Sequence, residues 1–188
     1  MSFNFNNPSK IFARLYAIFC PFYGRRFYRK LINALDLSGD EHILDFGSGV
    51  GTLGKKLIKL LRTEEGQLTC LDTSPAFLNR ARRKLRNYGN VNFLLGNIQN
   101  LNIESNRFDI IISSWVLHHI RLKELDDILL EFNKCLKPKG RIFIIEYTKE
   151  PHGISEEKIL LLFRNNGLKI VDKFSNKNTL LLEFKKVN

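Results

Sequence analysis

The sequence predicts an α/β fold: a three-layer αβα sandwich on a mostly parallel seven-stranded sheet that closes with an antiparallel C-terminal hairpin. Two observations support this fold class. Short apolar runs alternate five times with stretches of helical periodicity, the pattern of a parallel sheet covered by helices. The last two apolar runs are separated only by the turn Ser175-Asn176-Lys177-Asn178, and two strands joined so tightly must pair antiparallel.

The first half of the chain is expected to begin with helix and then alternate strand and helix. Proline disfavours helix in the residue before it, so the first helical stretch breaks near Cys20-Pro21. Ser74-Pro75 opens a later helix, with serine as its cap and proline in its first turn. The expected elements are two helical pieces over 9–35, a strand at 41–46, a helix at 51–61, a strand at 67–71, a helix from 74 to about 88 and a strand at 91–95.

The second half continues the alternation and ends in two adjacent strands. The helix that follows the fourth strand stops before Pro138, and Ser155 begins the last helix. The expected elements are a strand at 108–113, a helix at 122–136, a strand at 140–147, a helix from 155 to about 166, and strands at 168–174 and 179–185.

Length and composition predict one globular domain over 1–188, with residues 1–40 as an N-terminal helical lid. The 188 residues are 44% hydrophobic and 26% charged, which excludes disordered and fibrous classes. There is no run of eighteen apolar residues, and the apolar stretch from Ile11 to Tyr23 lacks the order of a signal peptide. We therefore expect a cytoplasmic protein. Cys20, Cys70 and Cys135 are odd in number and far apart, which predicts buried thiols and no metal site.

The chain is strongly basic. Thirty Lys and Arg against nineteen Asp and Glu give a net charge of +11, which favours nucleic acid, anionic lipid or an acidic substrate as partner, or simply reflects a lysine-rich composition. Two basic clusters exceed this background, at 25–30 and 80–86. The second falls on an expected surface helix, where a solvated face is the usual explanation.

The most informative motif is the glycine-rich segment Asp45-Phe46-Gly47-Ser48-Gly49-Val50-Gly51. It follows the first expected strand, and open α/β sheets bind ligands at the carboxyl ends of their strands. Glycines let a backbone approach the ligand, and amides at a helix N-terminus attract an anion. Asp72 ends the second expected strand, where a carboxylate can accept hydrogen bonds from both hydroxyls of a ribose.

Two cofactor classes fit this motif. Gly49-x-Gly51-x-x-Gly54 matches the GxGxxG pattern of nicotinamide dinucleotide sites, with Asp72 about twenty residues further on. Asp45 favours S-adenosylmethionine instead. A carboxylate before the glycines would face a pyrophosphate unfavourably, whereas the ammonium group of S-adenosylmethionine is attracted to an acid.

These residues resemble class I S-adenosylmethionine-dependent methyltransferases over nearly the whole chain. Segment 43–51 is similar to the glycine-rich first motif of that family, 71–74 to its ribose-binding acidic turn and 96–98 to its adenine-binding turn. FDIIISSWVLHHI at 108–120 and LKPKGR at 136–141 are similar to its later motifs. The resemblance implies a Rossmann-like domain that binds S-adenosylmethionine and transfers a methyl group without a metal. The cofactor-binding residues that it implies are Tyr23, Asp45, Gly47, Ser48, Gly49, Gly51, Asp72, Thr73, Asn97, Ile98 and Ser113.

His118 and His119 follow the fourth expected strand and are the candidate catalytic bases, because histidine titrates in a useful pH range. Adjacent helical residues point about 100° apart, so at most one of the two is expected to face the acceptor. Alignment of two reactants can itself supply roughly 7–11 kcal/mol. A base is therefore not mandatory, and both histidines could instead serve in packing or hydrogen bonding. Ser113 and Ser114 are candidate caps of the helix that follows.

The expected acceptor is a small molecule or a lipid-like molecule. YAIFCPFY at 16–23 resembles the N-terminal segment of the branch that methylates quinones and phospholipids. An aromatic, basic lid suits an apolar substrate at an anionic membrane surface, although core packing explains the aromatic residues equally well. RNA is the main competing acceptor, but Ser113-Ser114-Trp115 stands where enzymes that methylate base amines have an Asn/Asp-Pro-Pro-aromatic turn. A nicotinamide-dependent oxidoreductase and a non-catalytic cofactor-binding partner of another subunit also remain open.

Overall fold

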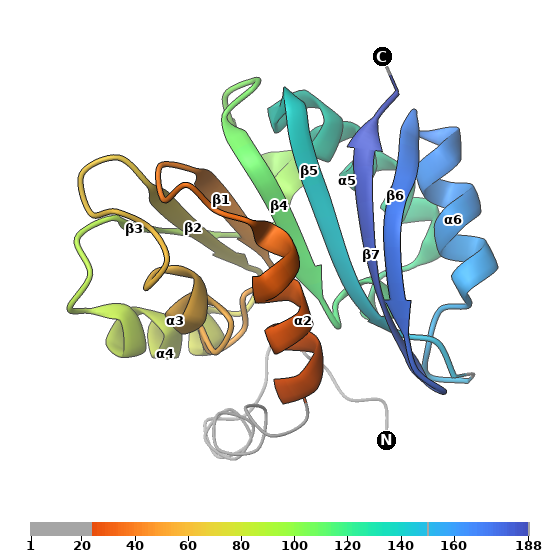
Figure 1. Cartoon of the computed structure of the whole chain (residues 1–188), viewed down its shortest axis with the longest axis horizontal. Coiled ribbons are helices and arrows are strands. Elements are labelled where there is room, and N and C mark those ends of the chain that lie inside the picture. The colour runs from red at the N-terminus through yellow and green to blue at the C-terminus, as the bar shows by residue number, and fades with distance from the viewer. Residues whose placement is uncertain (1–23, 150, 188) are drawn as a thin grey trace. The chain divides into compact units, whose positions relative to one another are not determined.

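A computed structural model describes residues 24–149 and 151–187 (Figure 1). The chain divides into two compact units, the first ending at Asn97 and the second beginning at Ile98. The first helical piece expected within 9–35 lies outside the described residues.

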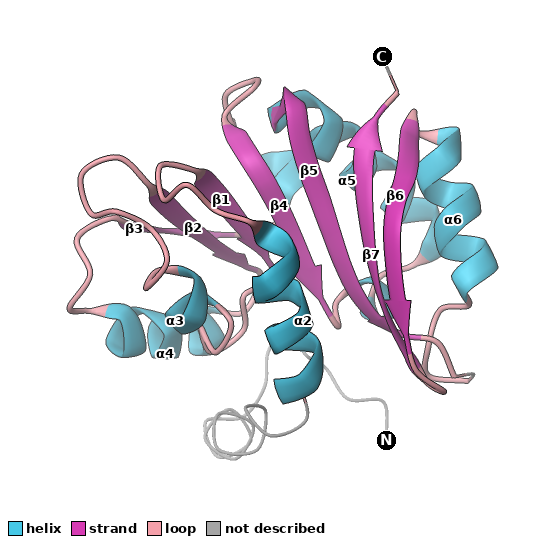
Figure 2. Cartoon of the chain, viewed as in Figure 1, coloured by secondary structure: helices cyan, strands magenta, loops and turns pink. Residues whose placement is uncertain are grey.

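The first unit contains three parallel strands in the order β3-β2-β1, with helices between them (Figure 2). β1 and β2 are almost wholly buried, as expected of parallel strands that are covered on both faces. Ser74 caps α4 as predicted, because its Oγ accepts a hydrogen bond of 3.3 Å from the backbone N–H of Phe77. The elements of this unit are α2 (Arg25–Leu35), β1 (His42–Phe46), α3 (Gly54–Leu57), β2 (Gln67–Asp72), α4 (Pro75–Leu85) and β3 (Val91–Leu95).

The helix expected at 51–61 is much shorter than predicted. Only Gly54–Leu57 is α-helical, although the apolar pattern extends beyond both ends. Gly51 has a φ of +73°, which is outside the right-handed helical region and delays the start of the helix. At the other end, the N–H of Leu60 bonds the carbonyl of Leu57 at 2.9 Å, and this tighter turn replaces a further α-helical turn.

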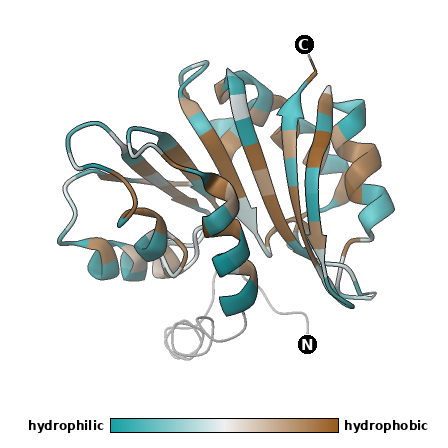
Figure 3. Cartoon of the chain, viewed as in Figure 1, coloured by the Kyte–Doolittle hydropathy of each residue, from teal (hydrophilic) through white to brown (hydrophobic). Residues whose placement is uncertain are grey.

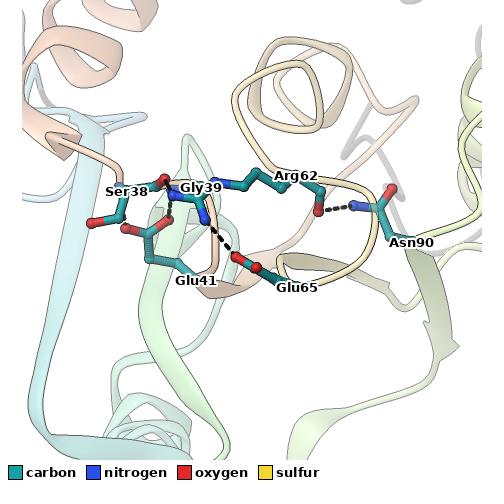
Figure 4. A network of polar contacts seen from close by, with 6 residues as sticks. All are labelled: Ser38, Gly39, Glu41, Arg62, Glu65 and Asn90. Atoms are coloured by element: carbon teal, nitrogen blue, oxygen red, sulfur yellow. Dashed lines mark hydrogen bonds and ion pairs between the residues drawn. The ribbon is translucent and has the colours of Figure 1, made fainter.

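A polar network ties together the loops that precede the three strands of the first unit (Figure 4). Arg62 donates to Glu65 at 2.6 Å and to the Ser38 carbonyl at 2.7 Å. The Asn90 side chain donates to the carbonyl of Arg62 at 3.2 Å. Because the strands are parallel, these loops all lie at the amino ends, and the carboxyl ends carry the glycine-rich turn and Asp72.

The second unit contains four strands in the order β4-β5-β7-β6. β4 and β5 are parallel, and β7 pairs antiparallel with both β5 and β6. This confirms the mostly parallel seven-stranded sheet and its antiparallel C-terminal hairpin. The elements are two 3-10 turns (Ile98–Asn100 and Leu117–His119), β4 (Phe108–Ser114), α5 (Leu122–Cys135), β5 (Leu136–Tyr147), α6 (Glu156–Asn165), β6 (Leu168–Ser175) and β7 (Thr179–Lys186).

β5 begins at Leu136, earlier than the predicted Gly140. The buried Leu136 pairs with Phe108, and the register then shifts before Ile110 pairs with Arg141. The irregular stretch accommodates Pro138, which cannot donate to a regular strand ladder.

Phe27, Tyr28, Leu31 and Leu35 of α2 are buried while its basic residues are exposed. Much of this helix is hydrophilic in composition (Figure 3). Phe27 and Tyr28 are 4% and 3% exposed, so two of the lid's aromatic residues are core residues. Cys70 and Cys135 are buried thiols. Across the residues that the structure describes, no helix has both the length and the apolar character needed to cross a membrane.

Candidate functional site

The glycine-rich turn of the first unit is held at the end of β2 by its own backbone. The N–H groups of Gly47 and Ser48 both donate to the carbonyl of Leu71, at 2.8 and 2.9 Å. Gly49 has a φ of +54°, and a Cβ added there would meet no atom within 4 Å. A Cβ at Gly51 would instead lie 3.0 Å from the Cβ of Ala81 in α4. The turn therefore packs closely against α4 at Gly51 and leaves open space beside Gly49.

The amides of this turn are not available for an anion in the way that the sequence suggested. The N–H groups of Gly47, Ser48, Gly49 and Gly51 all donate to acceptors within the first unit. The helix that follows is only four residues long. The turn therefore offers a ligand its shape and its neighbouring carboxylates rather than a row of free donors.

Asp72 is a buried carboxylate at the carboxyl end of β2. Its Oδ2 accepts from the Gly49 N–H at 2.7 Å, and its Oδ1 accepts from the Ser74 N–H at 2.8 Å. A carboxylate has about four acceptor positions, so both oxygens keep capacity for a ligand's hydroxyl groups. The carbonyl of Asp72 also accepts from the Gly96 N–H at 3.1 Å, which holds the turn containing Asn97 at the same end of the strands.

Asp45 is buried at 1% exposure, and neither of its side-chain oxygens has a hydrogen-bond partner among the described residues. Burial and the nearby Asp72 raise the pKa of Asp45 to about 7. A buried carboxylate without a partner is unfavourable, so the site gains from a cationic donor. The ammonium group of an amino-acid moiety, such as that of S-adenosylmethionine, is such a donor.

The remaining predicted cofactor residues are more dispersed. Thr73 and Asn97 are exposed, whereas Ile98 is buried and is the first residue of the second unit. Tyr23 lies outside the described residues.

At the end of β4 the backbone turns sharply. Ser113 is fully buried, and its Oγ has no hydrogen-bond partner within the described part of the chain. Trp115 has a φ of +54°, unusual for a bulky residue, and its N–H donates to the carbonyl of Ile145 at 2.7 Å. Neither Ser113 nor Ser114 caps the following turn, because Val116 occupies the N-cap position there without a side-chain bond.

Glu146 is the functional candidate that sequence reasoning missed. It is fully buried in β5, and its carboxylate bonds the Nδ1 of His118. It also accepts from the backbone N–H groups of Leu117 and Tyr147, both at 2.8 Å. A single acidic residue within the apolar strand GRIFIIEY was the signal that could have identified it.

The two histidine rings lie against each other, with centroids 3.9 Å apart and planes tilted by 51°. Desolvation and then the adjacent His118 lower the pKa of His119 to about 4, so His119 is neutral near pH 7. His118 is the histidine that a buried carboxylate orients.

Comparisons with known proteins identify the family of this chain. The family model of a methyltransferase domain matches residues 43–140, slightly more than half of the chain. The ubiquinone/menaquinone biosynthesis C-methyltransferase of Shewanella pealeana is 33% identical over 115 residues, 60% of this chain and 45% of that protein. The enzyme of the same name from Pseudoalteromonas translucida is 31% identical over 133 residues, 69% of this chain and 52% of that protein. The chain thus spans about half the length of these relatives.

Solved structures with low sequence identity share the fold across both units. A TehB-like SAM-dependent methyltransferase from Corynebacterium glutamicum superposes with a TM-score of 0.74 at 20% identity, covering 94% of this chain and 97% of that chain. The 1,6-didemethyltoxoflavin-N1-methyltransferase of Burkholderia thailandensis was solved with S-adenosylhomocysteine. It gives a TM-score of 0.74 at 18% identity, and the match covers 91% of this chain and 81% of that chain. These likenesses confirm the Rossmann-like fold class. With the family match over 43–140, they show that this chain belongs to the methyltransferase domain family.

Proposed function

We propose that this chain binds S-adenosylmethionine and transfers its methyl group to a small-molecule or lipid-like acceptor with a quinone-like ring. The observation that carries the proposal is the buried carboxylate of Asp45, which directly precedes the glycine-rich turn and has no hydrogen-bond partner among the described residues. Relatives named for ubiquinone and menaquinone biosynthesis support the class of acceptor.

Each of two buried carboxylates would bind a different part of the cofactor. Asp45 would receive the ammonium group, and Asp72 would accept from the ribose hydroxyls. We assign the adenine side to Asn97 and Ile98, and further contacts to Thr73 and Ser113. The bound cofactor supplies an electrophilic methyl group on a sulfonium.

Competing functions fit the first unit less well. A nicotinamide dinucleotide would bring its pyrophosphate to the glycine-rich turn, where the turn's amides are already paired and Asp45 adds negative charge. For an RNA acceptor, the support is the net charge of +11 alone.

Calorimetry and a transfer assay together test the proposal. We expect S-adenosylmethionine and S-adenosylhomocysteine to bind and NAD to show no heat of binding. Transfer from S-adenosylmethionine with a tritiated methyl group should label the lipid or small-metabolite fraction of a cell extract. Binding of NAD alone would overturn the cofactor, and label confined to RNA would overturn the acceptor class.

We also propose that α2 brings this otherwise cytoplasmic protein to an anionic membrane surface, where a lipid-like acceptor resides. Its exposed residues include Arg25, Arg26, Arg29 and Lys30, and its first turn has no acidic residue. Cations near the N-terminus of a helix oppose the helix dipole at roughly 0.3–1 kcal/mol each. Helix stability therefore does not explain this cluster, whereas attraction to anionic lipid does.

The basic cluster on α4 is the matched comparison. There, Arg83 and Arg86 are exposed like Arg25 and Arg29 of α2, so exchanging either pair for glutamate changes the net charge by the same amount. We expect Arg25→Glu with Arg29→Glu to abolish sedimentation with phosphatidylserine-containing vesicles, and Arg83→Glu with Arg86→Glu to have a much smaller effect. Equal losses of vesicle binding in the two double variants would show that binding depends on net charge and not on α2. Retention of vesicle binding by the α2 variant would refute the assignment.

A further inference from the structure

We propose that Glu146 is a positioning residue that holds His118 as the general base, and that the acceptor group is one that loses a weakly acidic O–H hydrogen, as a phenol or an enol does. This inference rests on the proposed methyl transfer. It adds the identity of the base, the residue that orients it and the chemistry of the group attacked.

The contacts of Glu146 determine which nitrogen of His118 carries hydrogen. The carboxylate is fully buried and accepts from two backbone N–H groups, those of Leu117 and Tyr147. An ionised carboxylate only accepts hydrogen bonds. The third contact, from the Nδ1 of His118, must therefore be an N–H donor. In neutral His118 the lone pair then lies on Nε2, and this nitrogen can take a proton from the molecule that is to be methylated.

The backbone around His118 makes this arrangement rigid. Leu117, the residue before it, is bonded to Glu146 through its N–H, and Trp115 is bonded to the carbonyl of Ile145. The side chain of His118 remains 14% exposed. Trp115 holds a strained φ of +54°, and such strain is commonly found where the fold fixes a functional group. The pKa of His119, lowered to about 4 by desolvation and by the adjacent His118, leaves that neighbouring ring a poor base near pH 7.

The chemistry that fits this base is methylation of a phenolic or enolic acceptor. His118 Nε2 takes the hydrogen of the O–H group, which makes the oxygen, or the ring carbon conjugated with it, nucleophilic. A new bond forms from that atom to the methyl carbon while the bond from sulfur to carbon breaks, and the sulfonium becomes a neutral thioether. After attack by a ring carbon, the hydrogen on that carbon leaves as a proton and the hydroxyl is restored, so one proton is released in either case.

Glu146→Leu tests the orientation. Leucine fills much of the same space but offers no acceptor to the Nδ1–H of His118, so the hydrogen of the neutral ring is no longer held on Nδ1 and Nε2 can carry it, the tautomer that cannot act as a base. In serine proteases a buried carboxylate holds the tautomer of the catalytic histidine in the same way. With 1,4-naphthoquinol as the acceptor probe, we expect kcat to fall about 100-fold or more, since general bases contribute that much. The affinity for S-adenosylmethionine, measured by calorimetry, should stay within about threefold.

Two further readouts separate orientation from a merely structural role. The nitrogen chemical shifts of His118 should report hydrogen on Nδ1 in the wild type and a shift of the hydrogen toward Nε2 in Glu146→Leu. Added imidazole should restore turnover to His118→Gly, because it replaces a missing base but not a missing packing contact. Glu183→Gln is the matched control, since Glu183 is another largely buried acid of the same unit that pairs with Arg141. We expect it to leave turnover and the His118 shifts unchanged.

The outcomes are decisive in both directions. Unchanged His118 shifts in Glu146→Leu, or full turnover in that variant, would overturn the role of Glu146. Absence of imidazole rescue would overturn the role of His118, including where Glu146→Leu does not fold. Wild-type protein that binds S-adenosylmethionine but leaves 1,4-naphthoquinol unmethylated would overturn the acceptor group. Wild-type protein that does not bind S-adenosylmethionine would overturn the proposed function instead.

Discussion

Replacing Asp72 with alanine is expected to weaken S-adenosylmethionine binding about 100-fold. Asp72 accepts from Gly49 and Ser74 and keeps acceptor capacity for a ribose. Hydrogen bonds to a charged acceptor contribute about 1.5–3 kcal/mol each, so the loss of two of them corresponds to at least that change in Kd. Titration calorimetry of the wild type and the variant measures the difference directly.

Two companion variants make the Asp72 result interpretable. Asp72→Asn keeps the volume of the side chain but places an N–H₂ group against backbone donors, so its affinity should also fall. Asp40→Ala removes an exposed acid of the same unit and should bind normally. Circular dichroism should show the same secondary structure in all three variants. Wild-type affinity in folded Asp72→Ala would refute the ribose assignment.

Asp45→Asn is expected to stabilise the free protein above neutral pH while weakening cofactor binding. Burial and Asp72 raise the pKa of Asp45 from 3.8 to about 7 in the folded state. Between these values the folded chain binds more protons than the unfolded chain, so Asp45 lowers the free energy of unfolding as pH rises through this window. The shift corresponds to about 4 kcal/mol of destabilisation above pH 7. Asparagine does not ionise and removes this contribution, although it remains a buried polar group.

Urea unfolding at pH 5.5 and pH 8 tests the stability part of this prediction. The free energy of unfolding of Asp45→Asn, relative to that of the wild type, should increase by about 2 kcal/mol from pH 5.5 to pH 8. Asp40→Asn, an exposed control, should show no such change. For the wild type, affinity for S-adenosylmethionine should rise with pH through about 7, because the ammonium group prefers the ionised carboxylate. If Asp45→Asn bound S-adenosylmethionine with the affinity of the wild type, Asp45 would not contact the ammonium group.

Elements that depend on local patterns were predictable from the chain alone. β3 has the predicted bounds of 91–95, and β2 and β4 each extend one residue further than predicted. A buried strand needs only a short apolar run, and Ser74-Pro75 marks the start of α4 through the side chains of those two residues. The prediction of a helix at 51–61 was wrong because its length depends on the φ of Gly51 and on the tight turn at Leu60, which the apolar pattern does not encode.

The candidate site divides in the same way. The order of motifs along the chain was sufficient for the family, for the positions of Asp45 and Asp72, and for the histidine pair, because these are properties of residue type and spacing. Which carboxylate lacks a hydrogen-bond partner within the described part of the chain, and which histidine is oriented by a buried acid, depend on contacts between residues far apart in sequence. Asp72 accepts a hydrogen bond from the Gly49 N–H, and Glu146 on β5 bonds the Nδ1 of His118, which follows β4. Those contacts form only when strands β2 and β5 place their carboxyl ends beside the turns that follow their neighbours, and burial there gives each charge its energetic importance.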